Sequence, residues 1–394
     1  MRKAITFERT KNICIILFPN QFLKSVDCYN MPSVDIDGRK IGSPDEDVFF
    51  IAEIGQNHQG NLKVAKQMIL EAKRIGCDCV KFQKSDLNAK FTKTALERVY
   101  ISKDSWGETY GDHKRFLEFS IEEYKELQEY ADTVGILFTA SAMDEQSLEM
   151  LDSLKVPFIK IGSGDANNFK LLKKAAQLQA PLIISTGMQT INTVKEIARI
   201  MEVAQKTNFA LMHCVSSYPT SPNNCRLKTI PLLQKMFPNV HIGYSGHEIG
   251  IEISSAAINL GARIIERHFT LGKGQKGSDH KCSLLPEEFE ELIHRTRLGY
   301  QPVGQEVSVA LEDIEDKIIL DCEMNCRNKL GKSLVYKRAL NKDDVIQEDD
   351  ISVKVSEPFG ITGEQVFEVI GKVLKRNVRE DDNVYFTDFF DNIC

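Results

Sequence analysis

The stretch VFFIAEIGQNHQGNLKVAKQMILEAKRIGCDCVKFQ, residues 48–83, shows the unit from which most of the chain is built. It opens with an apolar run rich in aromatic and β-branched residues, passes through a turn and then carries apolar residues at helical spacing over positions 62–75. Gly76 stands where the C-cap of that helix is expected, and a second apolar run, CVKFQ, follows shortly afterwards. A strand, a helix and another strand in this order predict a βαβ unit with parallel strands.

The same alternation continues to about residue 300. Further helical patterns cover positions 121–134, 145–154, 191–204 and 249–260, and Gly135 and Gly261 fall at C-cap positions. The predicted strands are VFFIAEIG, CVKFQ, GILFTAS, PFIKIGS, PLIISTG, FALMHCV, VHIGYS and RIIERHF. Eight βα units over ~250 residues predict a closed (β/α)8 TIM barrel for residues 47–300. A doubly wound sheet is the alternative, but no glycine-rich phosphate-binding sequence follows the first strand.

The regions on either side of the predicted barrel differ from it in pattern. Residues 1–46 are expected to be an N-terminal extension and lead-in, of which residues 1–30 lie outside the fold. Residues 301–332 form a linker of mixed charge. Residues 333–394 contain three short predicted strands, in SLVYKRAL, DISVKV and NVYFTDF, and so predict a small β-rich domain. A domain of about 60 residues is marginally stable alone, so we expect it to dock onto another part of the protein.

The composition excludes several classes of partner. The chain carries 50 basic and 56 acidic side chains, a formal net charge of −6, without a basic run that would follow a phosphate backbone, so nucleic acid is not an expected partner. The ten cysteines are scattered and form no CxxC pair, which favours free thiols in a reducing cytoplasm. The apolar run at residues 13–18 is far shorter than the ~20 residues that a membrane-spanning helix needs. We therefore expect a cytoplasmic protein that does not bind membranes.

Polar side chains collect at the ends of the predicted strands, where the chemistry of a (β/α)8 barrel takes place. The side chains at these ends are Glu53, Lys81, Gln83, Ser141, Lys160, Ser163, Ser185, His213, Tyr218, Ser245, His247, Glu266 and His268. Two ammonium groups with several hydroxyl donors around one cavity fit a small phosphate or carboxylate ligand. The structural alternatives are a buried ion pair for each lysine and ordinary turn or capping roles for single serines.

The histidines His247 and His268 lie at the ends of the seventh and eighth predicted strands, which pair side by side about 5 Å apart. Their imidazoles can therefore meet at one divalent ion, such as Mn²⁺, Zn²⁺, Mg²⁺ or Co²⁺, with Glu266 or Asp279 nearby to orient them. A buried structural role is the alternative for each histidine. We expect structural or surface roles for other histidines such as His58, which lies in the first loop.

The eighth run, RIIERHFT at residues 263–270, places three ionisable side chains in a row after an apolar start. We expect Ile264 and Ile265 to fill the barrel, and Glu266 and His268 to alternate to one side at its mouth. Arg267 is expected to point away from the mouth or to pair with a carboxylate.

These segments together resemble one protein family. The segments IAEIGQNHQGNLKVAKQMI, VKFQK, FIKIGSGDANNF, IISTGMQT, HIGYSGHE and IERHFTLGKGQKGSDHKCSLLPEEF are similar to the motifs of the sialic acid synthases, over essentially the whole of residues 47–390. GQNHQG, ALERVYISKDSWGETYGDHKRFLEFS and KGSDH resemble the animal members most, which make a sialic acid 9-phosphate. The resemblance implies a (β/α)8 barrel joined to a small antifreeze-like (SAF) domain. It also implies a homodimer in which this domain of one subunit covers the barrel mouth of the other.

The resemblance implies an activity and a set of roles. Members condense phosphoenolpyruvate with an N-acetylmannosamine, here the 6-phosphate, to a nine-carbon sialic acid 9-phosphate and inorganic phosphate, with the help of a divalent metal ion. N-acetylmannosamine itself and mannose 6-phosphate are acceptors that the sequence leaves open. Carried over by motif, phosphoenolpyruvate is held by Lys81, Lys160, Ser141, Ser163 and Ser185, with Ser245 at the same wall and Gln83 as a further substrate-binding residue. The metal ion is held by His247 and His268. Glu53 binds or deprotonates the sugar end, and the open-chain sugar is oriented by Tyr218, Glu266 and Asp279.

Two positions depart from the bacterial members of the family. Ser216 in HCVSSYP stands where they carry an asparagine that contacts the N-acetyl group, and the segment around Lys354 lacks the arginine that their antifreeze-like domain contributes. Two other functions stay open on the residues alone. One is a metal-dependent phosphosugar isomerase or aldolase, and the other is a non-catalytic carbohydrate- or ice-binding protein.

Overall fold

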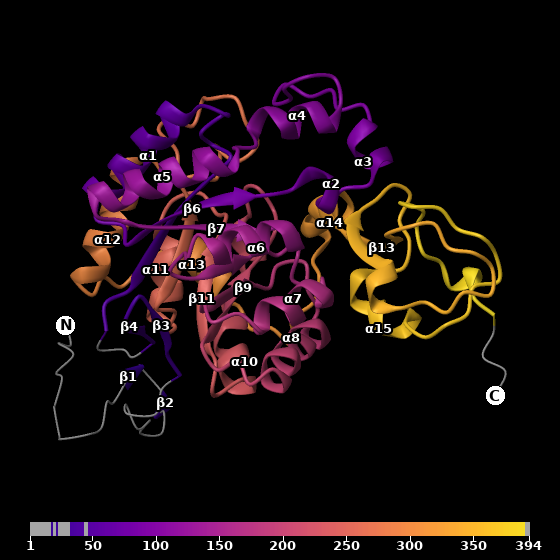
Figure 1. Ribbon diagram of the computed structural model, residues 1–394. Coiled ribbons are helices and arrows are strands. Elements are labelled where there is room, and N and C mark those ends of the chain that lie inside the picture. Colours follow the sequence, from indigo (N-terminus) through magenta and orange to yellow (C-terminus); the bar gives the residue numbers. More distant parts are fainter. Residues whose placement is uncertain (1–16, 19–20, 23–31, 43–45, 391–394) are drawn as a thin grey trace.

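The computed structural model describes residues 17–18, 21–22, 32–42 and 46–390. Its centre is a closed barrel with the strand order β10-β11-β12-β5-β6-β7-β8-β9, and neighbouring strands are parallel (Figure 1). The strands are β5 (Phe49–Gly55), β6 (Cys79–Lys84), β7 (Leu137–Ala142), β8 (Ile159–Ile161), β9 (Leu182–Ser185), β10 (Phe209–Cys214), β11 (His241–Gly246) and β12 (Ile264–His268). Each predicted apolar run coincides with one of these strands to within one or two residues at its carboxyl end, so the predicted (β/α)8 barrel is confirmed.

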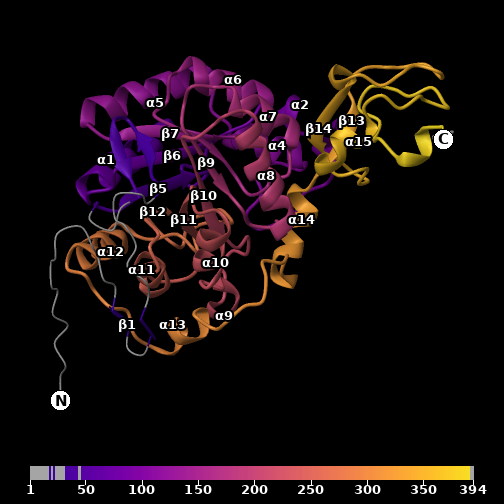
Figure 2. The same ribbon diagram turned by 90° about the horizontal axis from the view of Figure 1, so that it is seen from below.

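Helices surround the barrel on all sides (Figure 2). The helices between successive strands are α1 (Leu62–Arg74), α5 (Ile121–Val134), α6 (Glu145–Ser153), α7 (Phe169–Ala176), α8 (Ile191–Val203), α10 (Thr229–Met236) and α11 (Glu252–Asn259), and α12 (Pro286–Arg297) follows the last strand. Local signals fix their ends: Ser120 and Glu123 form a capping box at the start of α5, and Gly135 ends it in the left-handed conformation with φ of 76°.

The predicted helix over positions 249–260 begins later than expected, at Glu252. Gly250 adopts a φ of 79°, a left-handed conformation that a right-handed helix does not contain. Ile249 therefore belongs to the loop after β11, and its side chain is exposed.

The loop after β6 is the longest excursion from the barrel rim. It contains α2 (Leu87–Lys90), α3 (Lys93–Glu97) and α4 (Tyr110–Leu117) before the chain returns to α5. A short helix, α9 (Pro222–Cys225), also follows β10. These elements stand at the carboxyl ends of the strands and shape the mouth of the barrel.

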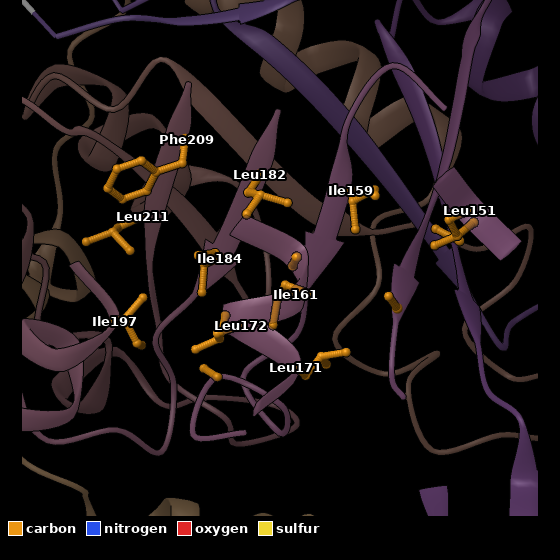
Figure 3. Packing of buried hydrophobic residues seen from close by; sticks show 14 of the residues in the cluster. Leu151, Ile159, Ile161, Leu171, Leu172, Leu182, Ile184, Ile197, Phe209 and Leu211 are labelled. Carbon is orange, nitrogen blue, oxygen red and sulfur yellow. The ribbon is translucent and has the colours of Figure 1, made fainter. Parts of the chain in front are cut away.

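The core has two layers because side chains alternate along each strand. Leu182 and Ile184 of β9 face outward and pack with Leu172 of α7 and Ile197 of α8 (Figure 3). Ile183, between them, belongs instead to the cluster inside the barrel. The same alternation corrects one prediction: Ile264 lies inside the barrel as expected, but Ile265 packs in the outer layer.

A hairpin closes the end of the barrel opposite the mouth. It consists of β3 (Val34–Ile36) and β4 (Arg39–Ile41), whose residues Val34, Ile36 and Ile41 belong to the same buried cluster as the barrel interior. Arg39 also pairs with Asp78 at 2.6 Å, just before β6. Residues 34–41 of the lead-in are therefore packed against the barrel. We predicted that residues 1–30 lie outside the fold. Of these residues the structure describes two short strands, β1 (Leu17–Phe18) and β2 (Gln21–Phe22), and the other positions are outside the described residues.

The region after the barrel contains few regular elements. They are α13 (Gln305–Ala310), α14 (Met324–Leu330), β13 (Lys332–Tyr336), β14 (Ile351–Val355) and α15 (Val366–Val369), and β13 pairs with β14 in antiparallel fashion. The predicted third strand in NVYFTDF is wrong, because Phe386–Asp388 forms a 3-10 turn. The buried carboxylate of Asp388 accepts hydrogen bonds from the amide of Tyr385 and the hydroxyl of Tyr336, which holds the chain in this turn.

The C-terminal domain docks on the mouth side of its own barrel (Figure 1). The ammonium of Lys332 lies 2.7 Å from the carboxylate of Asp165, which follows β8, and both side chains are buried. The amide of Thr92, after α2, donates to the carbonyl of Val355 at 3.0 Å. The expectation that this small domain packs on another part of the protein is therefore met within one chain.

Within the described residues, no helix is long and apolar enough to cross a membrane. The cysteines found there in free form are Cys77, Cys79, Cys214, Cys225, Cys282, Cys322 and Cys326.

The Asp165–Lys332 ion pair predicts a large effect on stability. Asp165→Asn leaves a buried ammonium without its counter-charge, and we expect the free energy of unfolding to fall by about 3 kcal/mol in urea denaturation. The matched control is Glu97→Gln, which removes one partner of the exposed Lys93–Glu97 pair and should cost less than about 0.5 kcal/mol. Equal losses in the two variants would contradict the importance of the buried pair.

Candidate functional site

The strand register brings the predicted polar side chains to one rim of the barrel. Glu53 on β5 is in register with Lys81 on β6 and with His268 on β12. Ser141 on β7 is likewise in register with Lys160 on β8. Residues that share a register lie at a similar height around a closed barrel, so their side chains converge on one mouth.

Lys81 joins the first group of rim residues. Its ammonium lies 2.6 Å from Oε2 of Glu53 and donates a hydrogen bond to the hydroxyl of Ser141 at 2.9 Å. Gln83 donates from its side-chain amide to the other carboxylate oxygen of Glu53 at 2.8 Å. Glu53, Lys81 and Ser141 are buried. Lys81 therefore forms the buried ion pair that was the structural alternative for this lysine. Its partners, Glu53 and Ser141, belong to the group of residues that was predicted to bind substrate.

Lys160 forms a second group around the carboxylate of Glu266. Its ammonium donates to the hydroxyl of Ser185 at 2.6 Å and lies 3.7 Å from Oε1 of Glu266. The ammonium of Lys81 lies at the same distance, 3.7 Å, from that oxygen. Ser245 donates to it at 3.3 Å. Glu266 therefore stands between two ammonium groups, while its second oxygen, Oε2, is buried without a hydrogen-bond partner.

The two carboxylates differ in their electrostatics. Burial raises the pKa of Glu53, and although Lys81 acts against this, the net shift is upward. Burial also acts to raise the pKa of Glu266, but Lys160 and Lys81 outweigh it, so this pKa lies below its usual value. Two carboxyl groups with opposite shifts are suited to different roles. Glu266 is the permanent anion, and Glu53 is the better group for exchanging a proton.

The two lysines also differ. Burial lowers the pKa of Lys160. Burial acts on Lys81 in the same direction, but Glu266 and Glu53 raise its pKa overall. Lys81 therefore holds its positive charge firmly, and the positive charge of Lys160 is less well compensated. Together the two lysines make the mouth attractive to an anionic ligand.

His247 and His268 face one another at the mouth, with 5.3 Å between their ring centres. The ring of Tyr218 lies 4.1 Å from that of His247 and 5.8 Å from that of His268. Asp279 lies 3.9 Å from Nδ1 of His268. The predicted meeting of the two imidazoles is therefore observed, and Tyr218 and Asp279 lie beside them.

The donor atoms of the two histidines fit a metal ion in part. Nδ1 of His247 donates to the carbonyl of Val215 at 2.8 Å, so Nε2 is left to bind a ligand. Burial lowers the pKa of His268 to about 3, so this ring is neutral at physiological pH, and its Nδ1 is buried without a hydrogen-bond partner. Within the described residues, no group of three or more histidine, cysteine or acidic side chains is close enough to hold an ion. The two imidazoles fit an open site whose other positions are filled by water or substrate.

Ser163 lies in a different part of the mouth from the two lysines. Its hydroxyl accepts a hydrogen bond from the amide of Gly187 at 3.0 Å and lies 3.4 Å from the sulfur of Cys214. It also lines a cavity of about 180 Å³ between the barrel rim and the C-terminal domain, together with Arg327 and Lys332. The structure therefore places Ser163 at the rim without a direct contact to Lys81 or Lys160.

Arg267 points away from the mouth, as expected, and pairs with a carboxylate. It is fully buried, and its guanidinium donates to Glu248 at 2.8 Å and to the hydroxyl of Ser254 at 2.9 Å. His58, in the first loop, is also structural: its ring stacks on Phe119 at 4.2 Å, and its Nδ1 accepts a hydrogen bond from the amide of Gly60.

Two features at the mouth carry no signal in the sequence. Glu323, from the linker, is buried and accepts hydrogen bonds from the amides of Met188 at 2.7 Å and Ser216 at 2.9 Å. Lys114 of α4 and Lys329 of α14 are far apart in the chain, but their ammonium groups lie 5.5 Å and 5.7 Å from the centre of the same ring, that of Tyr110. Only the folded chain brings these groups together.

The two departures from the bacterial pattern can now be located. The hydroxyl of Ser216 is buried and has no hydrogen-bond partner. Lys354 pairs with Asp381 at 2.7 Å within the C-terminal domain. Lys354 is therefore engaged inside its own domain and does not reach this barrel mouth.

Comparison with known proteins connects this geometry to one family. Residues 68–308 match the model of the NeuB family, and residues 331–389 match that of the SAF domain. The chain is 56% identical over 353 residues to an N-acetylneuraminate-9-phosphate synthase from Drosophila melanogaster, covering 86% of this chain and 95% of that one. It is 50% identical over 347 residues to the human enzyme of the same name, covering 88% and 94%.

A solved structure shows the same architecture. The spore coat polysaccharide biosynthesis protein SpsE from Bacillus subtilis superposes with a TM-score of 0.77 at 28% sequence identity, and the match covers 91% of this chain and 99% of that one.

The buried state of His58 predicts a pH dependence of stability. Burial lowers its pKa from an ordinary 6.5 to about 3, so the unfolded chain binds a proton at pH 5 that the folded chain does not. The stabilisation is complete above pH 6.5 and is lost as the pH falls towards 3, and between pH 7 and 5 we expect a loss of roughly 1 to 2 kcal/mol.

Urea denaturation of the wild type and of His58→Asn at both pH values isolates this contribution. The cost of the substitution should shrink by the same amount at pH 5. A cost that is equal at the two pH values would show that His58 is not held neutral.

Proposed function

Because the chain belongs to the NeuB family, the family of the sialic acid synthases, we propose that it condenses phosphoenolpyruvate with N-acetylmannosamine 6-phosphate. The products are N-acetylneuraminate 9-phosphate and inorganic phosphate. The observation that carries this proposal is the pair of buried ammonium groups, Lys81 and Lys160, held on either side of Glu266 at the barrel mouth.

The two lysines are suited to hold phosphoenolpyruvate. This substrate carries a phosphate and a carboxylate, and two ammonium groups that face the same carboxylate from β6 and β8 can each meet one of them. Ser141 and Ser185, which already bond to these lysines, would donate to the remaining anionic oxygens. We also assign Ser245 and Gln83 to the binding of phosphoenolpyruvate, and we place Ser163 at the edge of this binding site.

The condensation forms a carbon–carbon bond and releases phosphate. The methylene carbon of phosphoenolpyruvate attacks the aldehyde carbon of the open-chain sugar, and water adds to the cationic carbon that remains. The tetrahedral intermediate then loses inorganic phosphate to leave the keto acid. Lys81 and Lys160 stabilise the negative charge of the phosphate until it departs.

Glu53 is the candidate for proton transfer in this sequence. Its raised pKa makes it the better proton carrier of the two carboxyl groups, and its contacts with Lys81 and Gln83 fix its position. Tyr218 and Asp279 would orient the sugar, since they lie beside His247 and His268. Glu266, two residues before His268 on β12, would take part with them.

His247 and His268 would hold a divalent ion, such as Mn²⁺, Mg²⁺ or Co²⁺, which supplies a Lewis acid for the sugar aldehyde. Burial would lower the pKa of His247, but Cys214 and the Val215 carbonyl raise it overall, and a metal ion at this ring would bind in competition with a proton.

The chain's division and assembly are part of the proposal. We assign residues 1–46 to the lead-in, 47–300 to the catalytic barrel, 301–332 to the linker and 333–394 to the SAF domain. We also propose a homodimer in which this domain covers the partner's mouth, and a cytoplasmic location consistent with the free cysteines in the described part of the chain.

A coupled assay of phosphate release tests the function. We expect inorganic phosphate from phosphoenolpyruvate only when N-acetylmannosamine 6-phosphate is present, in step with formation of a nine-carbon keto acid. Lys160→Met should lower kcat/KM by about a hundredfold, on the order of 3 kcal/mol of transition-state stabilisation.

The control for this variant is Lys206→Met, a lysine near the opposite end of the barrel that donates to the carbonyls of Leu178 and Ala180. Its kcat/KM should stay near that of the wild type. Phosphate release without the sugar, or sugar isomerisation without phosphate release, would contradict the proposal and favour an isomerase or aldolase.

The histidine pair predicts metal dependence. His268→Ala should lower activity by about a hundredfold and weaken Mn²⁺ binding as followed by electron paramagnetic resonance. His294→Ala, which changes an exposed histidine on α12, is the control. Full turnover of the wild type in excess chelator would argue against a catalytic ion.

A further inference from the structure

A second cationic group lies beside the mouth and takes no part in the mechanism above. It consists of Lys114 from α4 and Lys329 from α14. Lys114 donates to the side-chain carbonyl of Gln56 at 3.1 Å, and Lys329 lies 3.4 Å from the hydroxyl of Tyr100. Both of these partners are neutral, and neither ammonium has an ion-pair partner among the described residues.

Both ammonium groups lie close to one aromatic ring. Nζ of Lys114 is 5.5 Å and Nζ of Lys329 is 5.7 Å from the ring centre of Tyr110. The tyrosine is fully buried, and its hydroxyl has no hydrogen-bond partner. The group therefore contains two cations and one unused hydroxyl in a small space.

A third cation at this ring does not share this condition. The guanidinium of Arg98 also lies over the Tyr110 ring, at 4.1 Å, but it pairs with Glu357 of the C-terminal domain. The charge of Lys114 is poorly compensated by comparison: burial, and next Lys329, lower its pKa to about 8. An anion placed between Lys114 and Lys329 would supply the missing counter-charge.

The cationic group lies at the sugar end of the proposed site. Gln56, which accepts the hydrogen bond from Lys114, directly follows β5 (Phe49–Gly55), and this strand carries Glu53, the candidate for proton transfer. The lysine pair therefore borders the rim next to Glu53.

We propose that Lys114 and Lys329 bind the phosphate group of a phosphorylated acceptor sugar, with the Tyr110 hydroxyl as a further donor. The inference rests on the proposed function for the identity of the sugar. Lys81 and Lys160 already meet the two anionic groups of phosphoenolpyruvate, so a second pair of cations at the opposite end of the acceptor fits a second phosphate. The site therefore selects a hexosamine 6-phosphate over the free hexosamine.

Equilibrium binding tests this selection without requiring turnover. Isothermal titration of N-acetylmannosamine 6-phosphate and of N-acetylmannosamine gives a ratio of dissociation constants for each variant. In the wild type we expect the phosphorylated sugar to bind at least tenfold more tightly. In Lys114→Met and in Lys329→Met this preference should fall severalfold, and in the double variant it should approach one.

Two further variants serve as controls. Lys103→Met removes an exposed lysine from the same long loop and should keep the wild-type preference. Lys329→Arg retains the charge and should keep most of the preference, which separates a loss of charge from a disturbance of α14. Circular dichroism melts show that each variant is folded.

A wild-type ratio near one, or a wild-type ratio in the folded double variant, would overturn the assignment. The phosphate-release assay is a separate readout. A protein that prefers the phosphorylated sugar but releases no phosphate supports the lysine site and contradicts the condensation, whereas a protein that condenses both sugars equally well and binds them equally contradicts the lysine site alone.

Discussion

The sharing of one carboxylate by two buried ammonium groups is the interaction on which the site depends. Glu266 lies 3.7 Å from both Lys81 and Lys160, and all three side chains are largely withdrawn from water. Two buried cations near one another repel, so the arrangement requires an anion between them. Glu53 pairs closely with Lys81, at 2.6 Å, whereas the carboxylate that faces Lys160 is the shared Glu266, so Lys160 is the less well compensated cation. The mouth therefore keeps an attraction for further negative charge, which an anionic substrate supplies.

The rest of the barrel holds this cluster in position. Glu53, Lys81, Lys160 and Glu266 all come from strands, so the hydrogen-bonded register fixes their heights. Arg267, the neighbour of Glu266, anchors β12 from outside through its buried contact with Glu248. The hairpin β3–β4 fills the opposite end of the barrel. Apolar packing therefore stabilises the barrel at the β3–β4 end and along its outer surface, and charged side chains are confined to the mouth. A (β/α)8 barrel is expected to separate stability and chemistry in this way.

Much of this could be predicted from the sequence, because strand periodicity and strand ends are local signals. The eight apolar runs predict the barrel, and the charged endings of these runs predict the rim from Glu53 to His268. Two predictions of secondary structure failed. The contacts of Asp388 turn the chain where a third strand was expected, and the left-handed conformation of Gly250 delays the start of α11. Lys114 and Lys329 could not be found at all, since they are separated by more than two hundred positions and meet only through the linker helix.

The most direct test of the account is a crystal structure of the protein with phosphoenolpyruvate. The account predicts that the phosphate and carboxylate oxygens of the ligand lie about 3 Å from the ammonium groups of Lys81 and Lys160, as charge-assisted hydrogen bonds require. Phosphoenolpyruvate bound elsewhere, with the Lys81–Glu266–Lys160 cluster closed and untouched, would show that the cluster is structural and would contradict the account.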